Sequence, residues 1–294
     1  MKRFDWKLTI KLNIFSLWMI GLWPKDNKYK FNFYTLYACF AISHFITSLG
    51  ILATVNTFMV DSDFEDSEEL TLYFIGEILT QIKVFMFIKN MRLLKQILKT
   101  LNDDLFQPKS LRQRQLIAPA LNFWKMVYNA FTAAGAPVIT LWVFRPLLNK
   151  SNEFQLPINV WYPFNTKTSP FYEIAFFHQI ISVFYTVIFV YNADMLIAAL
   201  MVYIGAQCDI LSDDLSNLQE KSVISFNKQL ANSIKHHKQI LIFAENCNTF
   251  FNLILLGQFL ASSIIISLIL YRVALILRSA WTYLTVLRSI NNLE

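Results

Sequence analysis

Residues Phe171 to Ile204 read FYEIAFFHQIISVFYTVIFVYNADMLIAALMVYI, and only Glu173 and Asp194 in this stretch carry a charge. A helix needs roughly 20 mostly apolar residues to cross a ~30 Å hydrocarbon core. This stretch is long enough to cross the core and to project beyond it on one side, because an α-helix rises ~1.5 Å per residue. It therefore predicts an integral membrane protein made of α-helices.

The composition of the whole chain points the same way. Of its 294 residues, 55% are hydrophobic and 16% are charged, whereas soluble domains average ~45–50% apolar and ~25% charged residues. The expected spans are approximately 33–60, 70–88, 123–148, 171–204 and 240–270, and we expect 271–294 to be an atypical tail or a partial sixth helix. The prediction is one all-α domain over 1–294, a multipass transmembrane helical bundle with five full spans.

Basic residues follow an alternating pattern along the connections. The segments 2–30, 89–125 and 221–238 are rich in Lys and Arg, whereas 61–69 and 150–170 contain almost none. The positive-inside rule then places the N-terminus in the cytoplasm. This distribution also accounts for the net charge of +6. We therefore expect the chain to contact the lipid membrane and no nucleic acid.

No constellation of catalytic residues is found in the sequence. The four histidines lack metal-ligand spacing with a carboxylate, and there is no Gly-rich phosphate loop, G-x-S-x-G or C-x-x-C. Three cysteines are too few, and odd in number, for a disulfide framework. We predict that the chain is not an enzyme and holds no metal or cofactor. His44 and His178 are interpreted as hydrogen-bonding groups between helices.

Several polar residues fall inside the expected spans, where ionisable groups are costly and point to function. Glu77 and Lys83 lie six residues apart in the second span, which places them on different helix faces. We expect Lys83 to extend toward the cytoplasmic surface. Glu245, Asn248 and Asn252 form one stripe on the fifth span. This stripe is interpreted as a hydrogen-bonding contact between helices, with an ion path as the alternative.

A set of short motifs carries a family resemblance. The set comprises Trp161-Tyr162-Pro163-Phe164, Ser169-Pro170, Tyr172-Glu173, His178-Gln179, Asp194, Gln207 and Leu211. These closely resemble the second outer loop and fourth helix of insect odorant receptors. Gln258-Phe259 and Ser262-Ser263 look like that family's fifth helix, and Gly21-Leu22-Trp23-Pro24 also fits. The resemblance covers roughly residues 10–267.

The resemblance implies a receptor subunit for a small volatile odorant. In that family the subunit works with a shared odorant co-receptor as an odorant-gated cation channel, in the plasma membrane of olfactory neurons. The family's odorant pocket lies among helices two, three, four and six. Carried onto this sequence, the ligand-binding candidates are Phe74, Ile75, Ile78, Phe131, Gly135, Ile139, Phe176, Phe177 and Ile180.

The resemblance ends before the chain does. The family has seven spans, of which the last lines the pore, and the pattern is lost here after about Ile266. We therefore expect a truncated chain, either a fragment or a non-conducting isoform. Other classes remain as alternatives: a gustatory-type chemoreceptor or, less well supported, a G-protein-coupled receptor or a secondary transporter.

One glycosylation candidate falls in an expected outer loop. Asn149-Lys150-Ser151 is an N-x-S sequon. Its position on the predicted outer side fits the topology, although it lies close to the end of the third span.

Overall fold

The computed structural model describes residues 3–25, 31–59, 64–148, 155–158, 160–218 and 223–291. All regular secondary structure in these residues is helical, which confirms the all-α prediction. The main helices are α1 (Lys11–Met19), α2 (Phe33–Ala41), the π-helical segment η2 (Ile42–Thr47), α3 (Ser48–Met59), α4 (Phe64–Lys89), α5 (Met91–Thr100), α6 (Leu111–Leu148), α7 (Phe171–Ser216) and α8 (Val223–Asn291). Two 3-10 turns, η1 (Trp6–Leu8) and η3 (Asp104–Phe106), complete the order. Asn149 lies outside the described residues.

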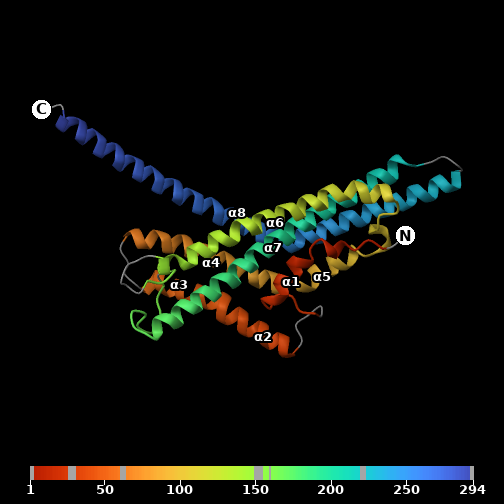
Figure 1. The fold of residues 1–294 in the computed structure, drawn as a ribbon. Helices are drawn as coiled ribbons and strands as arrows, with labels where there is room; N and C mark the ends of the chain where they lie inside the picture. The colour runs from red at the N-terminus through yellow and green to blue at the C-terminus, as the bar shows by residue number, and fades with distance from the viewer. Residues whose placement is uncertain are drawn as a thin grey trace.

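The long helices form one elongated bundle. α7 packs against both α6 and α8, while α4 packs against α3 and α8. In Figure 1, α6, α7 and the first part of α8 run alongside one another. The C-terminal part of α8 extends away from the other helices. α7 is therefore the central helix, in contact with α1, α6, α8 and the π-helical segment η2.

Two helices are much longer than a membrane is thick. α7 has 46 residues and α8 has 69, which correspond to roughly 70 Å and 100 Å. Both lengths exceed a ~30 Å hydrocarbon core, and that the two helices project beyond it on one side stays a prediction. After Gly257, the sequence of α8 contains no Gly or Pro, the residues that most disfavour a helix. The helix accordingly passes Leu270 without a break and continues through 271–291.

Four helical stretches in the described residues are long and apolar enough to cross a membrane. They are Phe33–Phe58, Leu111–Leu148, Phe171–Ser216 and Val223–Thr285. These stretches correspond to the first, third, fourth and fifth expected spans. The second expected span, 70–88, lies within α4 and packs in the bundle between α3 and α8. That it crosses the membrane stays a prediction.

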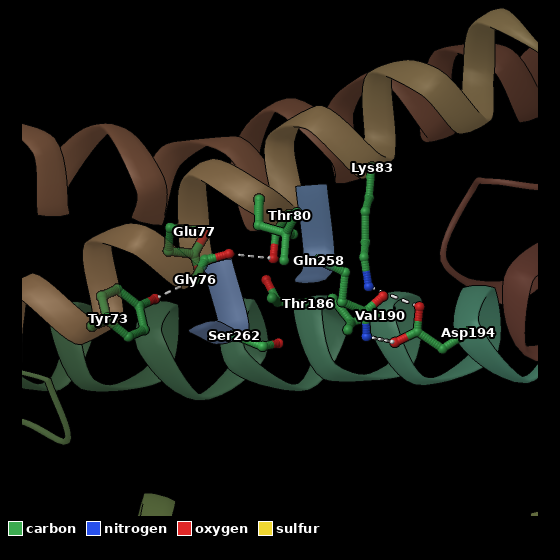
Figure 2. Close-up of a pocket in the computed structure, with 11 residues that line it drawn as sticks. Tyr73, Gly76, Glu77, Thr80, Lys83, Thr186, Val190, Asp194, Gln258 and Ser262 are labelled. Carbon is green, nitrogen blue, oxygen red and sulfur yellow. Dashed lines mark hydrogen bonds and ion pairs between the residues drawn. The ribbon is translucent and has the colours of Figure 1, made fainter. Parts of the chain in front are cut away.

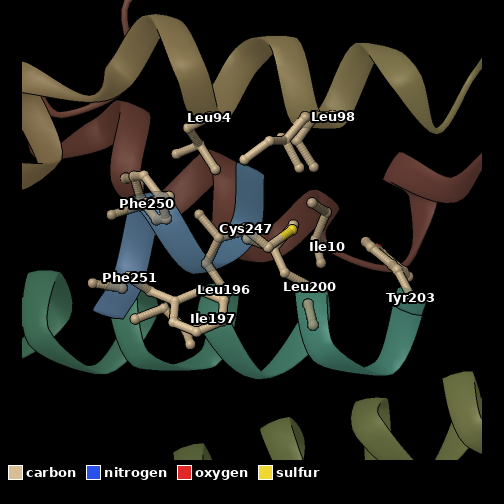
Figure 3. Packing of buried hydrophobic residues seen from close by; sticks show 14 of the residues in the cluster. Ile10, Leu94, Leu98, Leu196, Ile197, Leu200, Tyr203, Cys247, Phe250 and Phe251 are labelled. Atoms are coloured by element: carbon tan, nitrogen blue, oxygen red, sulfur yellow. The ribbon is translucent and has the colours of Figure 1, made fainter. Parts of the chain in front are cut away.

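The main hydrophobic core lies where α5, α7 and α8 meet. Leu94 and Leu98 of α5 are buried one turn apart on the same face. They pack in one cluster with Leu196 and Leu200 of α7 and Phe250 of α8 (Figure 3). Residues four apart lie one above the other on a helix, so a short apolar stripe on α5 faces α8, with which α5 packs.

Two basic segments of the sequence, 2–30 and 89–125, meet the end of α7 at one end of the bundle. Arg3 forms an ion pair with Asp104 at 3.1 Å. Arg112 pairs with Asp213 at the end of α7, also at 3.1 Å, and Lys109 pairs with the neighbouring Asp214. The N-terminus, the segment before α6 and the end of α7 are thus joined, as the charge pattern predicts for one side of a membrane. Which side this end faces stays a prediction.

Candidate functional site

A partly buried ion pair connects α4 and α7 in the middle of the bundle. Lys83 Nζ lies 2.7 Å from Asp194 Oδ1; the Lys83 side chain is only 2% exposed, whereas that of Asp194 is 33% exposed. Gln258 Nε2 of α8 donates a hydrogen bond to the other carboxylate oxygen of Asp194 at 3.3 Å. Figure 2 shows the three side chains converging from three helices. The expectation that Lys83 extends toward the membrane surface is therefore wrong, because an acidic partner holds it inside.

A cavity of about 410 Å³ lies beside this ion pair. Its lining comes from α4, α7 and α8 (Figure 2). The lining residues are Tyr73, Gly76, Glu77, Leu79, Thr80, Lys83, Thr186, Val190, Asp194, Gln258 and Ser262. We call this space the central cavity. Its volume is within the range of small-molecule sites, which are concave, mostly apolar and carry a few polar groups.

One face of α4 supplies the polar wall of the central cavity. Tyr73, Glu77 and Thr80 are spaced by four and three residues, so they lie on one side of the helix. The Tyr73 hydroxyl donates to Glu77 Oε1 at 2.9 Å, and Glu77 is only 4% exposed. Lys83 lies further around the same helix, yet the cavity is wide enough for Glu77 and Lys83 both to line it.

A second cavity lies at the N-terminal end of α7, beside the loop that precedes this helix. It measures about 340 Å³ and is lined by His44, Ser48, Ile51, Leu52, Tyr162, Pro163, Phe164, Ile174 and His178. His178 Nδ1 is hydrogen-bonded to the Tyr162 hydroxyl at 2.9 Å, and its Nε2 to Ser48 Oγ at 2.9 Å. His178 thus joins α3, α7 and the loop, which confirms its interpretation as an interhelical hydrogen-bonding group.

His44 contributes to this contact in a different way. It lies in the π-helical segment and packs its ring against that of His178, with centroids 5.4 Å apart. Its backbone oxygen lies 3.2 Å from His178 Nε2. In the described residues no group of three or more metal-ligating side chains is found. The two histidines therefore serve packing and hydrogen bonding at this end of the bundle.

The loop before α7 is also tied down by Gln179. Its Nε2 donates to the Ile158 oxygen at 2.9 Å, and its Oε1 accepts from the Ile158 nitrogen at 3.0 Å. Gln179 is fully buried. One side chain thus satisfies both backbone polar groups of a loop residue, which would be costly to leave unpaired in a buried position.

Replacing Gln179 by methionine is expected to loosen this loop. Methionine keeps the approximate size but removes both bonds to Ile158, and an unsatisfied buried group costs ~1–3 kcal/mol. We expect a loss of about 2 kcal/mol in unfolding free energy, because the Ile158 oxygen keeps its bond from the Val160 nitrogen at 3.0 Å and only the Ile158 nitrogen is left unpaired. Hydrogen exchange around Ile158 should rise. Gln96→Met, at an exposed position on α5, is the control, and equal exchange in both variants would contradict the tether.

The nine candidates proposed from the sequence do not form a single site in the structure. Ile139 of α6 and Ile180 of α7 pack in one small cluster with Tyr73, which also lines the central cavity. Phe74 packs edge-on against Phe58 of α3, with centroids 5.8 Å apart. Ile75 is half-buried in α4.

The other candidates lie on several surfaces. Phe131, Phe177 and Ile78 are exposed. Phe176 is buried against Tyr172, and a Cβ added to Gly135 would have no neighbour within 4 Å. Of the nine candidates, only Ile139 and Ile180 pack against a common cluster in the structure. The polar wall of the central cavity was not predicted. The signal for that wall was available in the helical spacing of Tyr73, Glu77 and Thr80.

The polar stripe on α8 also differs from expectation. Glu245, Asn248 and Asn252 are all exposed in the structure. Asn252 Oδ1 accepts a bond from the adjacent backbone nitrogen of Leu253. The interpretation as a hydrogen-bonding contact between helices is therefore not met in the described part of the chain.

Known structures share this architecture. The insect olfactory receptor OR5 from Machilis hrabei in complex with eugenol superposes with a TM-score of 0.78 at 18% identity, covering 92% of this chain and 73% of that chain. The structure described as OR5 alone gives a TM-score of 0.75 at 17% identity, covering 91% and 72%. At this identity the likeness shows the fold. A search of curated proteins finds no match.

A family comparison goes further than the fold. The model described as "7tm Odorant receptor" matches residues 68–287 of this chain. That match covers α5, α6 and α7 entirely and most of α4 and α8. This family consists of receptors and not of enzymes, in agreement with the missing catalytic constellation. Because the match covers well over half of the sequence, the chain belongs to the odorant receptor family.

Proposed function

We propose that this chain binds small volatile odorants in the central cavity and, with the family's shared co-receptor, forms an odorant-gated cation channel in the plasma membrane of olfactory neurons. The observation that carries the proposal is the 410 Å³ cavity lined by α4, α7 and α8 inside an odorant-receptor fold. Support comes from OR5 of Machilis hrabei, a structural relative described in complex with eugenol. Odorant binding by this chain rests on that likeness and on the cavity.

Among the nine candidates from the sequence, two are best supported as ligand contacts. Ile139 and Ile180 pack against the same small buried cluster as Tyr73, and Tyr73 forms part of the wall of the central cavity. These two candidates are therefore the ones that share a cluster with a cavity residue. The seven others stay proposals.

Gly76 offers a direct test of odorant binding. It lines the central cavity, and a Cβ at this position meets no atom within 4 Å. Gly76→Leu should therefore fill the cavity without displacing the backbone. We expect binding of neutral volatiles such as 1-hexanol to the purified chain to weaken at least about tenfold, a loss of ~1.4 kcal/mol. Gly205→Leu is the matched control, because Gly205 of α7 also faces open space but is absent from the cavity lining.

The channel part of the proposal needs a separate measurement. The chain is co-expressed with the co-receptor, and current evoked by a panel of neutral volatiles is compared with that of the co-receptor alone. Current that depends on this chain and is reduced by Gly76→Leu supports a conducting receptor. Saturable binding without current would contradict the channel and leave odorant binding intact. Absence of both would overturn the proposed function.

A further inference from the structure

The central cavity contains more acidic than basic side chains. Its ionisable residues are Glu77, Lys83 and Asp194, apart from the weakly acidic Tyr73. Lys83 and Asp194 neutralise each other at 2.7 Å. No ion pair to Glu77 is formed within the described residues, so the ionised cavity has one unbalanced negative charge. Buried charges in proteins are as a rule paired.

Glu77 is also incompletely hydrogen-bonded. Tyr73 donates to Oε1, whereas Oε2 is buried and forms no hydrogen bond of ordinary geometry in the part of the chain that the structure describes. The neighbouring Gln81 amide, which also acts on this carboxylate, donates to the Ile46 oxygen at 3.0 Å. The residue is only 4% exposed. An isolated acidic group in a membrane-spanning region is a strong indication of function. A buried acceptor left unpaired costs ~1–3 kcal/mol, and more when it is charged.

Two further polar atoms of the cavity wall share this condition. Gln258 Oε1 and Thr186 Oγ1 are buried and have no hydrogen-bond partner among the described residues. Figure 2 shows Thr186 on α7 and Gln258 on α8, on the wall opposite α4. Each oxygen can accept a hydrogen bond. The remaining wall includes apolar groups, notably Leu79 and Val190.

We infer that the central cavity selects a primary amine with a short hydrocarbon chain, an inference that rests on the proposed function of odorant binding. An ammonium group carries three donors and no acceptor, which suits a site with three unpaired acceptor atoms. Its positive charge balances Glu77, while Lys83 and Asp194 remain paired. The hydrocarbon chain packs against Leu79 and Val190. An alcohol of the same length supplies one donor and no charge.

The test compares n-hexylamine with 1-hexanol at pH 7. Equilibrium binding of both probes is measured on the purified chain in lipid nanodiscs. We expect the amine to bind at least about tenfold more tightly than the alcohol. Glu77→Gln should remove this preference, because the amide keeps the shape and loses the charge. Glu77→Asp should retain a preference, and Glu245→Gln, at an exposed carboxylate on α8, should leave it unchanged.

The outcomes separate the inference from the proposed function. Equal affinity for the two probes in the unmodified chain, or an undiminished amine preference in folded Glu77→Gln, would overturn amine selection. If 1-hexanol and other neutral volatiles still bind and respond to Gly76→Leu, the proposed odorant binding stands. If no probe of either kind binds, both the inference and the proposed function fail. If Glu77→Gln does not fold, the amine preference in the unmodified chain and in Glu77→Asp decides the result.

Discussion

Replacing Lys83 by methionine is expected to destabilise the folded chain by about 2–3 kcal/mol. Removing one partner of a fully buried ion pair costs ~3–5 kcal/mol, and the loss is smaller here because the Asp194 side chain is 33% exposed. Asp194 would keep the 3.3 Å bond from Gln258 but lose its only close cation in the described residues. Methionine preserves most of the length and the apolar stem. The loss of stability therefore reports the cost of leaving the Asp194 carboxylate unpaired, and not the cost of an empty space left by a smaller side chain. Unfolding of the purified chain in detergent, followed by circular dichroism, gives the difference.

The design includes a rescue and a control. Lys83→Met combined with Asp194→Leu should recover most of the stability, because replacing both buried charges by apolar groups is often neutral or favourable. Lys89→Met, at the exposed end of the same helix, removes only a cation 5.8 Å from the ring centroid of Phe85. It should cost less than ~1 kcal/mol. Equal stability of Lys83→Met and the unmodified chain would show that the pair is not formed in solution.

Lys83 also shows where sequence reasoning stops. Its charge inside a span was visible, and so was that of Asp194, but the two are separated by 111 positions. Nothing local indicates that they meet. The extension of a lysine toward the membrane surface was the reasonable expectation for an unpaired residue. The partner exists only because α4 packs beside α7 and α8, an arrangement set by the whole bundle.

Properties that depend on local composition were predicted well. The helical class, the excess length of α7 and α8 and the gathering of basic segments at one end all follow from hydropathy and charge along the chain. Hydropathy says less about which face of a membrane helix is inside, because lipid-facing and buried surfaces are both apolar. Phe177 and Phe176 are adjacent and equally apolar, yet the first is 62% exposed and the second 6%.

Polar spacing is informative on α4 but misleading on α8, where the stripe of Glu245, Asn248 and Asn252 is exposed. Tyr73, Glu77 and Thr80 recur at helical intervals, and the structure places all three on the cavity wall. The partners from α7 and α8 were not predictable in the same way. Thr186 and Gln258 join this wall only through tertiary packing.

Gly21→Ala is expected to lower the unfolding free energy by about 3 kcal/mol. Gly21 has a φ of +85°, a left-handed conformation that costs an L-residue ~1–2 kcal/mol. It ends α1 in a Schellman motif: the Leu22 nitrogen donates to the Leu17 oxygen at 2.9 Å, and the Gly21 nitrogen to the Trp18 oxygen at 3.1 Å. Loss of this turn would misdirect the chain between α1 and α2.

The close approach of α2 adds to the effect of Gly21→Ala. A Cβ on Gly21 would lie 2.8 Å from the Ala38 Cα, a backbone atom that cannot rotate away, and overpacking typically costs ~1–3 kcal/mol. Gly205→Ala is the control: its Cβ meets nothing within 4 Å, and alanine in a helix is favoured over glycine by up to ~1 kcal/mol. The two variants should shift the unfolding midpoint in opposite directions. A midpoint for Gly21→Ala at or above that of the unmodified chain would mean that neither the turn nor the contact with α2 is present in solution.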